Sequence, residues 1–273
     1  MIPWTDGATG HMTVQGKALE YRCVGPAPDQ APTIVLLHEG LGCVVLWRDL
    51  PERLAQATGW GVFAYSRAGY GQSDPADLPR PLDYMTREAM DVLPGVLDQA
   101  GFRRGVLMGH SDGATIAAIY AGSVEDFRVR GLVLMAPHFF TEEMGLAEIA
   151  QARTAFETTD LKQKMARYHR DPDNTFRGWN DAWLDPGFRA WDVSEVIDYL
   201  RIPVLAIQGR EDQYGTLAQI DEVAERSYAP VDVEVIEECR HAPHLDQPDR
   251  VLACVAEFTQ RLARIEAAKT DAA

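Results

Sequence analysis

Short apolar runs alternate with helix-length amphipathic stretches along most of this 273-residue chain. Runs of five or six residues that are rich in aliphatic side chains are typical of strands buried inside a sheet. They lie at residues 33–38, 61–66, 105–109, 131–135, 203–208 and 231–236. Helical patterns lie at residues 86–100, 114–121, 217–227 and 251–267. Because parallel strands are joined through crossover helices, this order predicts a mostly parallel α/β sheet with helices on both faces.

A hairpin is predicted before the first of these strands. Polarity alternates over residues 12–24 around Gly16 and Lys17, as it does in two antiparallel strands joined by a tight turn. With this hairpin added to the parallel strands, we expect a sheet of eight strands.

Residues 141–199 interrupt the alternation, because no strand pattern occurs there. Helical patterns at residues 146–156 and 161–168 come first. An aromatic stretch follows, with Phe176, Trp179, Trp183, Phe188 and Trp191. So long a segment between two strands favours a helical lid over the strand ends, and a pair of ordinary crossover helices is the alternative. We therefore expect a core of residues 1–140 and 200–273 and a lid of residues 141–199.

The chain has a formal net charge of -15 at pH 7. A field of that sign repels phosphate backbones and anionic lipids, so we expect neither nucleic acid nor a membrane as a partner. No run of about 18 apolar residues occurs, and the first ten residues do not resemble a secretory signal. The four cysteines form no CxxC pair, which is typical of buried free thiols in a reducing compartment. We therefore expect a cytoplasmic protein.

Residues 109–113 read Gly-His-Ser-Asp-Gly and match the G-x-S-x-G nucleophile elbow. In an elbow the serine lies on a sharp turn between a buried strand and a helix, and the glycines remove Cβ atoms that would clash there. The turn exposes the hydroxyl, and the helix N-terminus beside it stabilises negative charge. A predicted strand precedes these residues and a helical pattern follows them. Ser111 is therefore the candidate nucleophile.

A serine hydroxyl needs a general base, and the base needs a carboxylate that orients it. Downstream of an elbow, the acid comes before the histidine along the chain. Asp212 follows one predicted strand, with Glu211 as the alternative acid. His241 follows the next strand, with His244 as the alternative base. Both loops leave the sheet on the same side as the elbow, so we expect the three side chains to converge.

Segments in this order resemble capped α/β-hydrolases over nearly the whole chain, and the branch of esterases and C–C hydrolases most. They are residues 38–40 (HEG), 66–73 (SRAGYGQS), 109–113 (GHSDG), 209–212 (GRED) and 241–244 (HAPH). The resemblance implies Ser111 as the nucleophile, Asp212 as the acid and His241 as the base. Arg240 departs from the family pattern, in which glycine usually precedes the catalytic histidine.

The resemblance also implies an oxyanion hole formed by the backbone N–H groups of Glu39 and Asp112. If both carboxylates face the site, they favour a cationic substrate group, such as an amine near the scissile carbonyl. In the alternative, Asp112 caps the following helix and Glu39 points to solvent. His138 and Trp183 are candidate substrate contacts. Their alternatives are a hydrogen-bonded structural histidine and an aromatic side chain that only packs the lid.

These features predict a hydrolase that cleaves a carboxylic ester of a small molecule through an acyl-enzyme on Ser111. The alternatives are a C–C bond hydrolase of the meta-cleavage type, an amino-ester or amide hydrolase, and a ligand receptor that turns over slowly. A zinc site at His241 and His244 would need a third clustered ligand, so we expect no metal and no cofactor. The sequence leaves the oligomeric state open, a homodimer included.

Overall fold

The computed structural model describes the backbone of residues 1–271, which includes an eight-stranded sheet. The strand order is β1-β2-β4-β3-β5-β6-β7-β8. The strands are β1 (Thr9–Val14), β2 (Lys17–Val24), β3 (Thr33–Leu37), β4 (Gly61–Tyr65), β5 (Gly105–His110), β6 (Val129–Met135), β7 (Val204–Gly209) and β8 (Val231–Ile236). β2 pairs antiparallel with β1 and with β4, and the other pairs are parallel. The predicted mostly parallel sheet of eight strands is confirmed.

The β1–β2 hairpin turns at Gln15 and Gly16, one residue earlier than the sequence indicated. Val14 pairs with Lys17, which leaves those two residues between the strands. Their φ angles are 48° and 75°, so both lie in the left-handed region that two-residue hairpin turns of type I′ require. The predicted turn at Gly16 and Lys17 is therefore wrong by one residue. Lys17 already pairs with Val14 in the sheet, so only Gln15 and Gly16 remain to form the turn.

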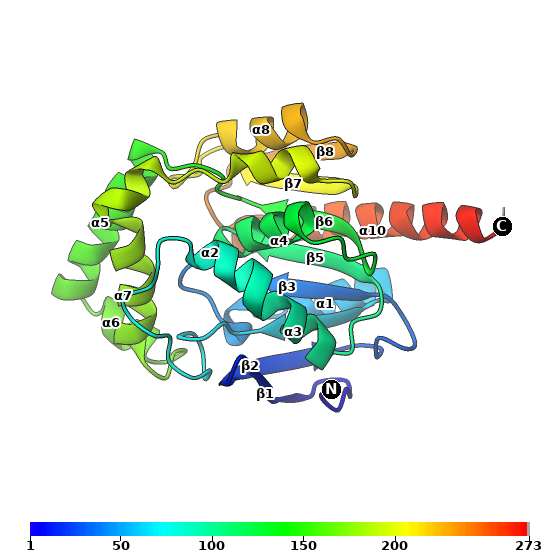
Figure 1. Ribbon diagram of the computed structural model, residues 1–273, viewed down its shortest axis with the longest axis horizontal. Coiled ribbons are helices and arrows are strands. Elements are labelled where there is room, and N and C mark those ends of the chain that lie inside the picture. The colour runs from blue at the N-terminus through cyan, green and yellow to red at the C-terminus, as the bar shows by residue number, and fades with distance from the viewer. Residues whose placement is uncertain (272–273) are drawn as a thin grey trace.

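Helices cover both faces of the sheet (Figure 1). Along β3, Ile34 and Leu36 join a hydrophobic cluster with α1 (Leu50–Thr58) and α10 (Pro248–Asp271), whereas Val35 and Leu37 join a second cluster with α3 (Leu93–Gln99) and α4 (Asp112–Ser123). A strand buried on both faces needs apolar side chains at every position, which explains the continuous apolar runs. The covering helices are α1 (Leu50–Thr58), α2 (Tyr84–Arg87), α3 (Leu93–Gln99), α4 (Asp112–Ser123), α8 (Ala218–Arg226) and α10 (Pro248–Asp271).

The helix predicted over residues 86–100 is not uniform. It begins at Tyr84 as α2, widens into a π-helical turn, η2 (Glu88–Val92), and continues as α3. Pro94 lies in the first turn of α3 and has no N–H to donate to the preceding turn. A local widening at this point accommodates the proline ring without ending the helix.

The segment between β6 and β7 is helical, as the sequence indicated. It comprises α5 (Glu143–Thr158), α6 (Leu161–Met165), α7 (Pro172–Trp183), η3 (Pro186–Ala190) and η4 (Ser194–Tyr199). The Asp171 side chain caps α7 by accepting from the N–H of Asn174 at 3.0 Å, and Pro172 follows the cap. The aromatic stretch therefore begins as a regular helix that buries Trp179 and Trp183. Figure 1 shows α5, α6 and α7 beyond one end of the strands.

Two further findings concern the whole described chain. Within residues 1–271, no helix combines the length and the apolar composition that crossing a membrane requires. All four cysteines are free: Cys23, Cys43 and Cys239 are buried, whereas Cys254 is partly exposed. The expected burial is therefore wrong for Cys254, which lies on α10 and faces partly outward.

Candidate active site

Ser111 lies on the turn between β5 and α4, with φ of 53° and ψ of -121°. A non-glycine residue rarely adopts this conformation, and the surrounding structure must hold it there. The N–H of Ser111 donates to the carbonyl of Met135 at 2.9 Å. A Cβ on Gly109 would collide with the backbone of Gly113, and one on Gly113 would collide with the carbonyl of Leu37. The strained elbow expected from the G-x-S-x-G motif is therefore present.

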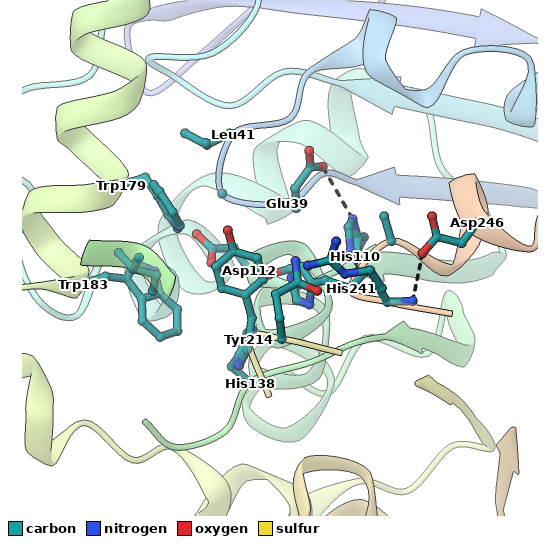
Figure 2. A pocket seen from close by; sticks show the side chains of 16 residues that line it. Glu39, Leu41, His110, Asp112, His138, Trp179, Trp183, Tyr214, His241 and Asp246 are labelled. Atoms are coloured by element: carbon teal, nitrogen blue, oxygen red, sulfur yellow. Dashed lines mark hydrogen bonds and ion pairs between the residues drawn. The ribbon is translucent and has the colours of Figure 1, made fainter. Parts of the chain in front are cut away.

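A cavity of about 360 Å³ opens at Ser111. Its wall combines residues from the loops after β3, β5, β6, β7 and β8 with residues from α5 and α7 (Figure 2). Ile149, Trp179 and Trp183 are the lining residues that the helical segment contributes. The carboxyl ends of the central strands and the helices beyond them thus enclose one site.

Asp212 and His241 are held together at this cavity. Both carboxylate oxygens of Asp212 lie 2.9 Å from Nδ1 of His241. The Asp212 side chain is 1% exposed and that of His241 is 13% exposed. A carboxylate at Nδ1 fixes the proton on that nitrogen and leaves Nε2 as an acceptor.

Three more groups donate to the Asp212 carboxylate. Gln208 Nε2 and the N–H of Tyr214 each lie 2.8 Å away, and the N–H of Gly215 lies 3.4 Å away. Burial raises the pKa of this carboxyl, but the hydrogen bond and charge of His241, together with the Tyr214 N–H, hold the pKa below its usual range. Asp212 is therefore ionised at neutral pH.

The alternatives to His241 and Asp212 lie elsewhere. His244 is outside the cavity wall, and its ring packs between Trp47 and His110. Burial lowers the pKa of His244 to about 3, so it is neutral. Glu211 accepts from the N–H of Cys239 at 2.7 Å and thereby holds the loop that precedes His241. The geometry favours His241 and Asp212 at both positions.

The Ser111 hydroxyl faces the same cavity as His241. Among the described residues, no side chain or carbonyl accepts a hydrogen bond from it. In unliganded enzymes the bond between nucleophile and base is often long and shortens only with substrate. The structure thus brings the three predicted residues to one site and pairs two of them directly.

The backbone N–H groups of Glu39 and Asp112 border the cavity and make no hydrogen bond within the described chain. The N–H of Gly40, which the sequence did not single out, also borders the cavity without a hydrogen bond. Free N–H groups beside a serine at a helix N-terminus are the donors that an oxyanion hole requires. Glu39, Gly40 and Asp112 are therefore its candidates.

The fully buried Arg67 fixes the backbone of the loop after β3 through hydrogen bonds. Its guanidinium donates to the carbonyl of His38 and, at 3.0 Å, to the carbonyl of Glu39. His38 donates from Nδ1 to the Glu39 carbonyl at 2.7 Å and accepts at Nε2 from the N–H of Arg67 at 3.1 Å. While these carbonyls are engaged, the N–H groups of Glu39 and Gly40 stay free of hydrogen bonds within the described chain.

The Glu39 side chain turns toward His110 and stays 29% exposed. Its Oε2 lies 3.6 Å from Nδ1 of His110, as the dashed line in Figure 2 marks. Burial alone raises the pKa of Glu39, but the nearby His110, with the neighbouring His38 and His244, lowers it well below its usual range. Glu39 is therefore an anion beside Nδ1 of His110, which makes no hydrogen bond among the described residues.

The Asp112 side chain neither caps α4 nor reaches solvent. It is fully buried, and its Oδ2 accepts from the Tyr84 hydroxyl at 2.5 Å. Tyr84 in turn accepts from Nε1 of Trp183 at 3.0 Å. Oδ1 of Asp112 is buried without a partner among the described residues. Helix capping, one of the two alternatives for this residue, is therefore wrong.

His138 and Trp183, the candidate substrate contacts, both line the cavity. The centroids of their rings lie 5.3 Å apart, and the centroid of the His138 ring lies 5.5 Å from that of the His241 ring. Burial and the nearby His241 lower the pKa of His138 to about 3, so its ring is neutral. Thr115 bonds only the backbone of His138, which leaves the imidazole facing the cavity.

Four other residues at the site were not singled out from the sequence. His110 occupies a variable position of the elbow motif, and Tyr214 follows Asp212 by two residues. Trp179 was one of several aromatic residues in the helical segment. Tyr84 carried no signal, because its contact with Asp112 joins segments 28 residues apart.

The described side chains do not support the alternative of a zinc site at His241 and His244. Among the described residues, no group of three or more His, Cys, Asp or Glu side chains is arranged to hold a metal ion.

Comparison with known proteins identifies the family of this chain. The model of the alpha/beta hydrolase family matches residues 34–253. A proline iminopeptidase from Lactobacillus delbrueckii subsp. lactis is 31% identical over 113 residues, which are 41% of this chain and only 38% of that protein. A proline iminopeptidase from Lactobacillus helveticus is 23% identical over 292 residues, which cover 91% of this chain and 96% of that protein.

Solved structures share the fold. The enol-lactonase from Burkholderia xenovorans LB400 superposes with a TM-score of 0.72 at 20% identity, over 91% of this chain and 99% of that chain. Because the family model spans most of the sequence and the sheet and elbow agree with it, the chain belongs to the alpha/beta hydrolase family.

Proposed function

We propose that this protein is a serine hydrolase that cleaves carboxylic esters of small molecules through an acyl-enzyme on Ser111. The observation that carries the proposal is the Asp212–His241 pair beside a serine with a strained elbow backbone. A buried carboxylate that fixes the tautomer of a histidine is what activation of a serine hydroxyl requires.

In the first half-reaction, Ser111 Oγ attacks the ester carbonyl carbon while its proton moves to Nε2 of His241. The tetrahedral intermediate then collapses: the bond to the alcohol oxygen breaks, and His241 gives its proton to the departing alkoxide. In the second half-reaction, water loses a proton to His241 and attacks the acyl carbon. The bond to Ser111 Oγ breaks, and Oγ recovers the proton, which leaves a carboxylic acid and the free enzyme.

The negative charge of each intermediate requires preorganised donors. The N–H groups of Asp112, Glu39 and Gly40 are free donors at the cavity. Removal of one such donor typically costs about 10²–10³ in rate. An ester is favoured over an amide because an alkoxide leaves more readily, without a strongly positioned acid.

We further propose that residues 141–199 act as a lid. Trp179 and Trp183 of α7 and Ile149 of α5 form the wall opposite the loops of the sheet. Such a wall would exclude water from the acyl group and hold its apolar part.

Covalent labelling tests the mechanism. The protein is treated with a fluorophosphonate, and the adduct is mapped by mass spectrometry, with Ser111→Ala as the blank. We expect a single adduct on Ser111 and hydrolysis of simple aryl esters that Ser111→Ala lacks. A folded protein that carries the adduct elsewhere, or none, would refute the proposal.

A further inference from the structure

We propose that the free carboxylate oxygen of Asp112 binds a protonated amine of the substrate, so that this site prefers esters with an amino group near the scissile carbonyl. The inference rests on the proposed function, since it names the substrate class of the same cavity. Asp112 follows Ser111 directly and lines the cavity. A group bound at its side chain therefore lies close to the acyl carbon that Ser111 would attack.

The hydrogen bonding of Asp112 is incomplete in a specific way. Oδ2 is satisfied by Tyr84, whereas Oδ1 is buried and unpartnered among the described residues. A buried carboxylate oxygen without a donor is costly, and such groups call for an explanation. Because Trp183 holds Tyr84 in place, the protein fixes the carboxylate and leaves Oδ1 buried without a donor. A substrate N–H group would complete the set of donors.

The charge around the cavity points the same way. Three carboxylates line it, those of Glu39, Asp112 and Asp246, against the single guanidinium of Arg240. Glu39 is already next to His110, and Oδ2 of Asp246 accepts from the N–H of Arg240 at 2.8 Å. The protein thus supplies Asp246 with a donor and Glu39 with a neighbouring imidazole, and both carboxylates also reach solvent. Of the three, Asp112 is the carboxylate that keeps a buried oxygen without a hydrogen-bond donor.

Aromatic side chains complete a surface suited to a cation. Trp179, Trp183 and Tyr214 line the same cavity as Asp112, as Figure 2 shows. The faces of aromatic rings attract ammonium groups. An anionic substrate group would gain nothing from these rings and would be repelled by the carboxylates.

A purely structural role for Asp112 makes a different prediction. Burial raises the pKa of Asp112 above its ordinary value, and the charges of the buried Arg67 and Arg80 act against that rise. Arg67 donates to the carbonyls of His38 and Glu39, and Arg80 donates to the carbonyl of Ala68 at 2.8 Å. Neither guanidinium donates to Asp112. A mere counter-ion would affect stability, whereas a ligand-binding carboxylate also sets substrate preference.

The test compares three ethyl esters of similar size: ethyl alaninate, ethyl lactate and monoethyl malonate. They present an ammonium, a hydroxyl and a carboxylate near the same ester, and kcat/KM is measured from ethanol release at a pH where the amine is protonated. For the wild type we expect the alaninate to exceed the lactate at least tenfold and the malonate to be the poorest. Asp112→Asn should reduce the alaninate-to-lactate ratio at least fivefold.

Asp246→Asn is the matched control, because it removes a lining carboxylate whose partner is a backbone N–H. Its alaninate-to-lactate ratio should stay within twofold of the wild type, and an equal fall in both variants would overturn the assignment to Asp112. If Asp112→Asn does not fold, competitive inhibition of ethyl lactate hydrolysis by propylammonium and by propanol decides the question in the wild type. Stronger inhibition by propylammonium supports the inference, and equal inhibition overturns it.

These outcomes separate the inference from the proposed function. Turnover of ethyl lactate with a labelled Ser111, but with no preference for the amine, refutes the amine site alone. Absence of turnover on all three esters, together with an unlabelled Ser111, refutes the serine mechanism.

Discussion

Nε2 of His110 lies 2.7 Å from the main-chain oxygen of His241, so the residue before the candidate nucleophile holds the backbone of the candidate base. The carbonyl can only accept, and Nε2 therefore carries the proton and donates. Nδ1 of His110 then faces the Glu39 carboxylate at 3.6 Å. This one imidazole connects the elbow, the loop after β3 and the loop after β8.

His110 is therefore expected to be a positioning residue. His110→Ala should lower kcat about 10- to 100-fold, because a small displacement of the base is costly in rate. His110→Gln, whose amide can donate to the same carbonyl, should recover part of the loss. The measurement is steady-state kinetics on a neutral aryl ester, with exposed His11→Ala as the control. Equal defects in His110→Ala and His110→Gln would count against positioning through this hydrogen bond.

The two downstream histidines should differ strongly in their effect on catalysis. His241→Ala is expected to lower kcat by several orders of magnitude, because members of a triad act as a unit. His244→Ala should act mainly on stability or KM, since its ring packs on Trp47 and His110 behind the cavity wall. Kinetics of both variants, with circular dichroism to verify folding, provide the comparison. The assignment fails if the two variants rank the other way.

The two adjacent acids should differ as well. Asp212→Asn removes the carboxylate that fixes the His241 tautomer and should lower kcat roughly 10⁴-fold. Glu211→Gln keeps an oxygen that can accept from the Cys239 N–H, so its kcat should fall far less. A comparable loss in both variants on the same ester would show that the acid has been wrongly identified.

Much of the fold could be predicted because its determinants are local. The apolar runs of β3 to β8 and the hairpin of β1 and β2 follow from residue patterns a few positions long. The elbow at Ser111 is equally local, since its glycines lie within two residues. The π-helical turn near Pro94 was not anticipated, because a helical pattern does not reveal how a helix accommodates a proline after its first turn.

The surroundings of the site were less predictable, because they depend on contacts between distant segments. The motif placed the backbone of Asp112, but its side chain is set by Tyr84, which no motif connects to it. Glu39 likewise pairs with His110, 71 residues away along the chain. Two orientations were expected for the Glu39 side chain, toward the site or toward solvent. Neither of them includes His110 as its neighbour.

Gly40 marks where α7 meets the candidate oxyanion loop. A Cβ on Gly40 would collide with the indole of Trp179. Gly40→Ala should therefore lower kcat/KM for a neutral ester by roughly 10- to 100-fold, by displacing either the loop N–H groups or the lid wall. Trp179→Leu removes the colliding ring, so the double variant should lose much less than the product of the single effects. Strictly multiplicative losses would mean that the two residues act independently.

His169 connects the helical segment to two loops of the core and supplies a pH test. Its Nδ1 accepts from the N–H of Gly71 at 3.0 Å, and its Nε2 donates to the carbonyl of Leu41 at 3.0 Å. Only the neutral ring can do both, and burial, as the largest cause, lowers the pKa of His169 despite the nearby Glu39 and Glu20.

Because the folded pKa of His169 is depressed, the unfolded chain binds a proton more readily than the folded one. The stabilisation is complete above the unfolded pKa of about 6.5 and is lost as pH falls through the folded value, by at most about 1.4 kcal/mol per pH unit. His38, His138 and His244 titrate in the same sense, so the contribution of His169 must be taken as a difference between variants.

The free energy of unfolding is measured in urea at pH 7.5, 6.5 and 5.5. His169→Gln should be less stable than the wild type at pH 7.5 and should lose less stability on acidification, whereas exposed His11→Gln should retain the wild-type slope. An unchanged slope in His169→Gln would show that His169 is not the proton-sensitive link between the helical segment and the core.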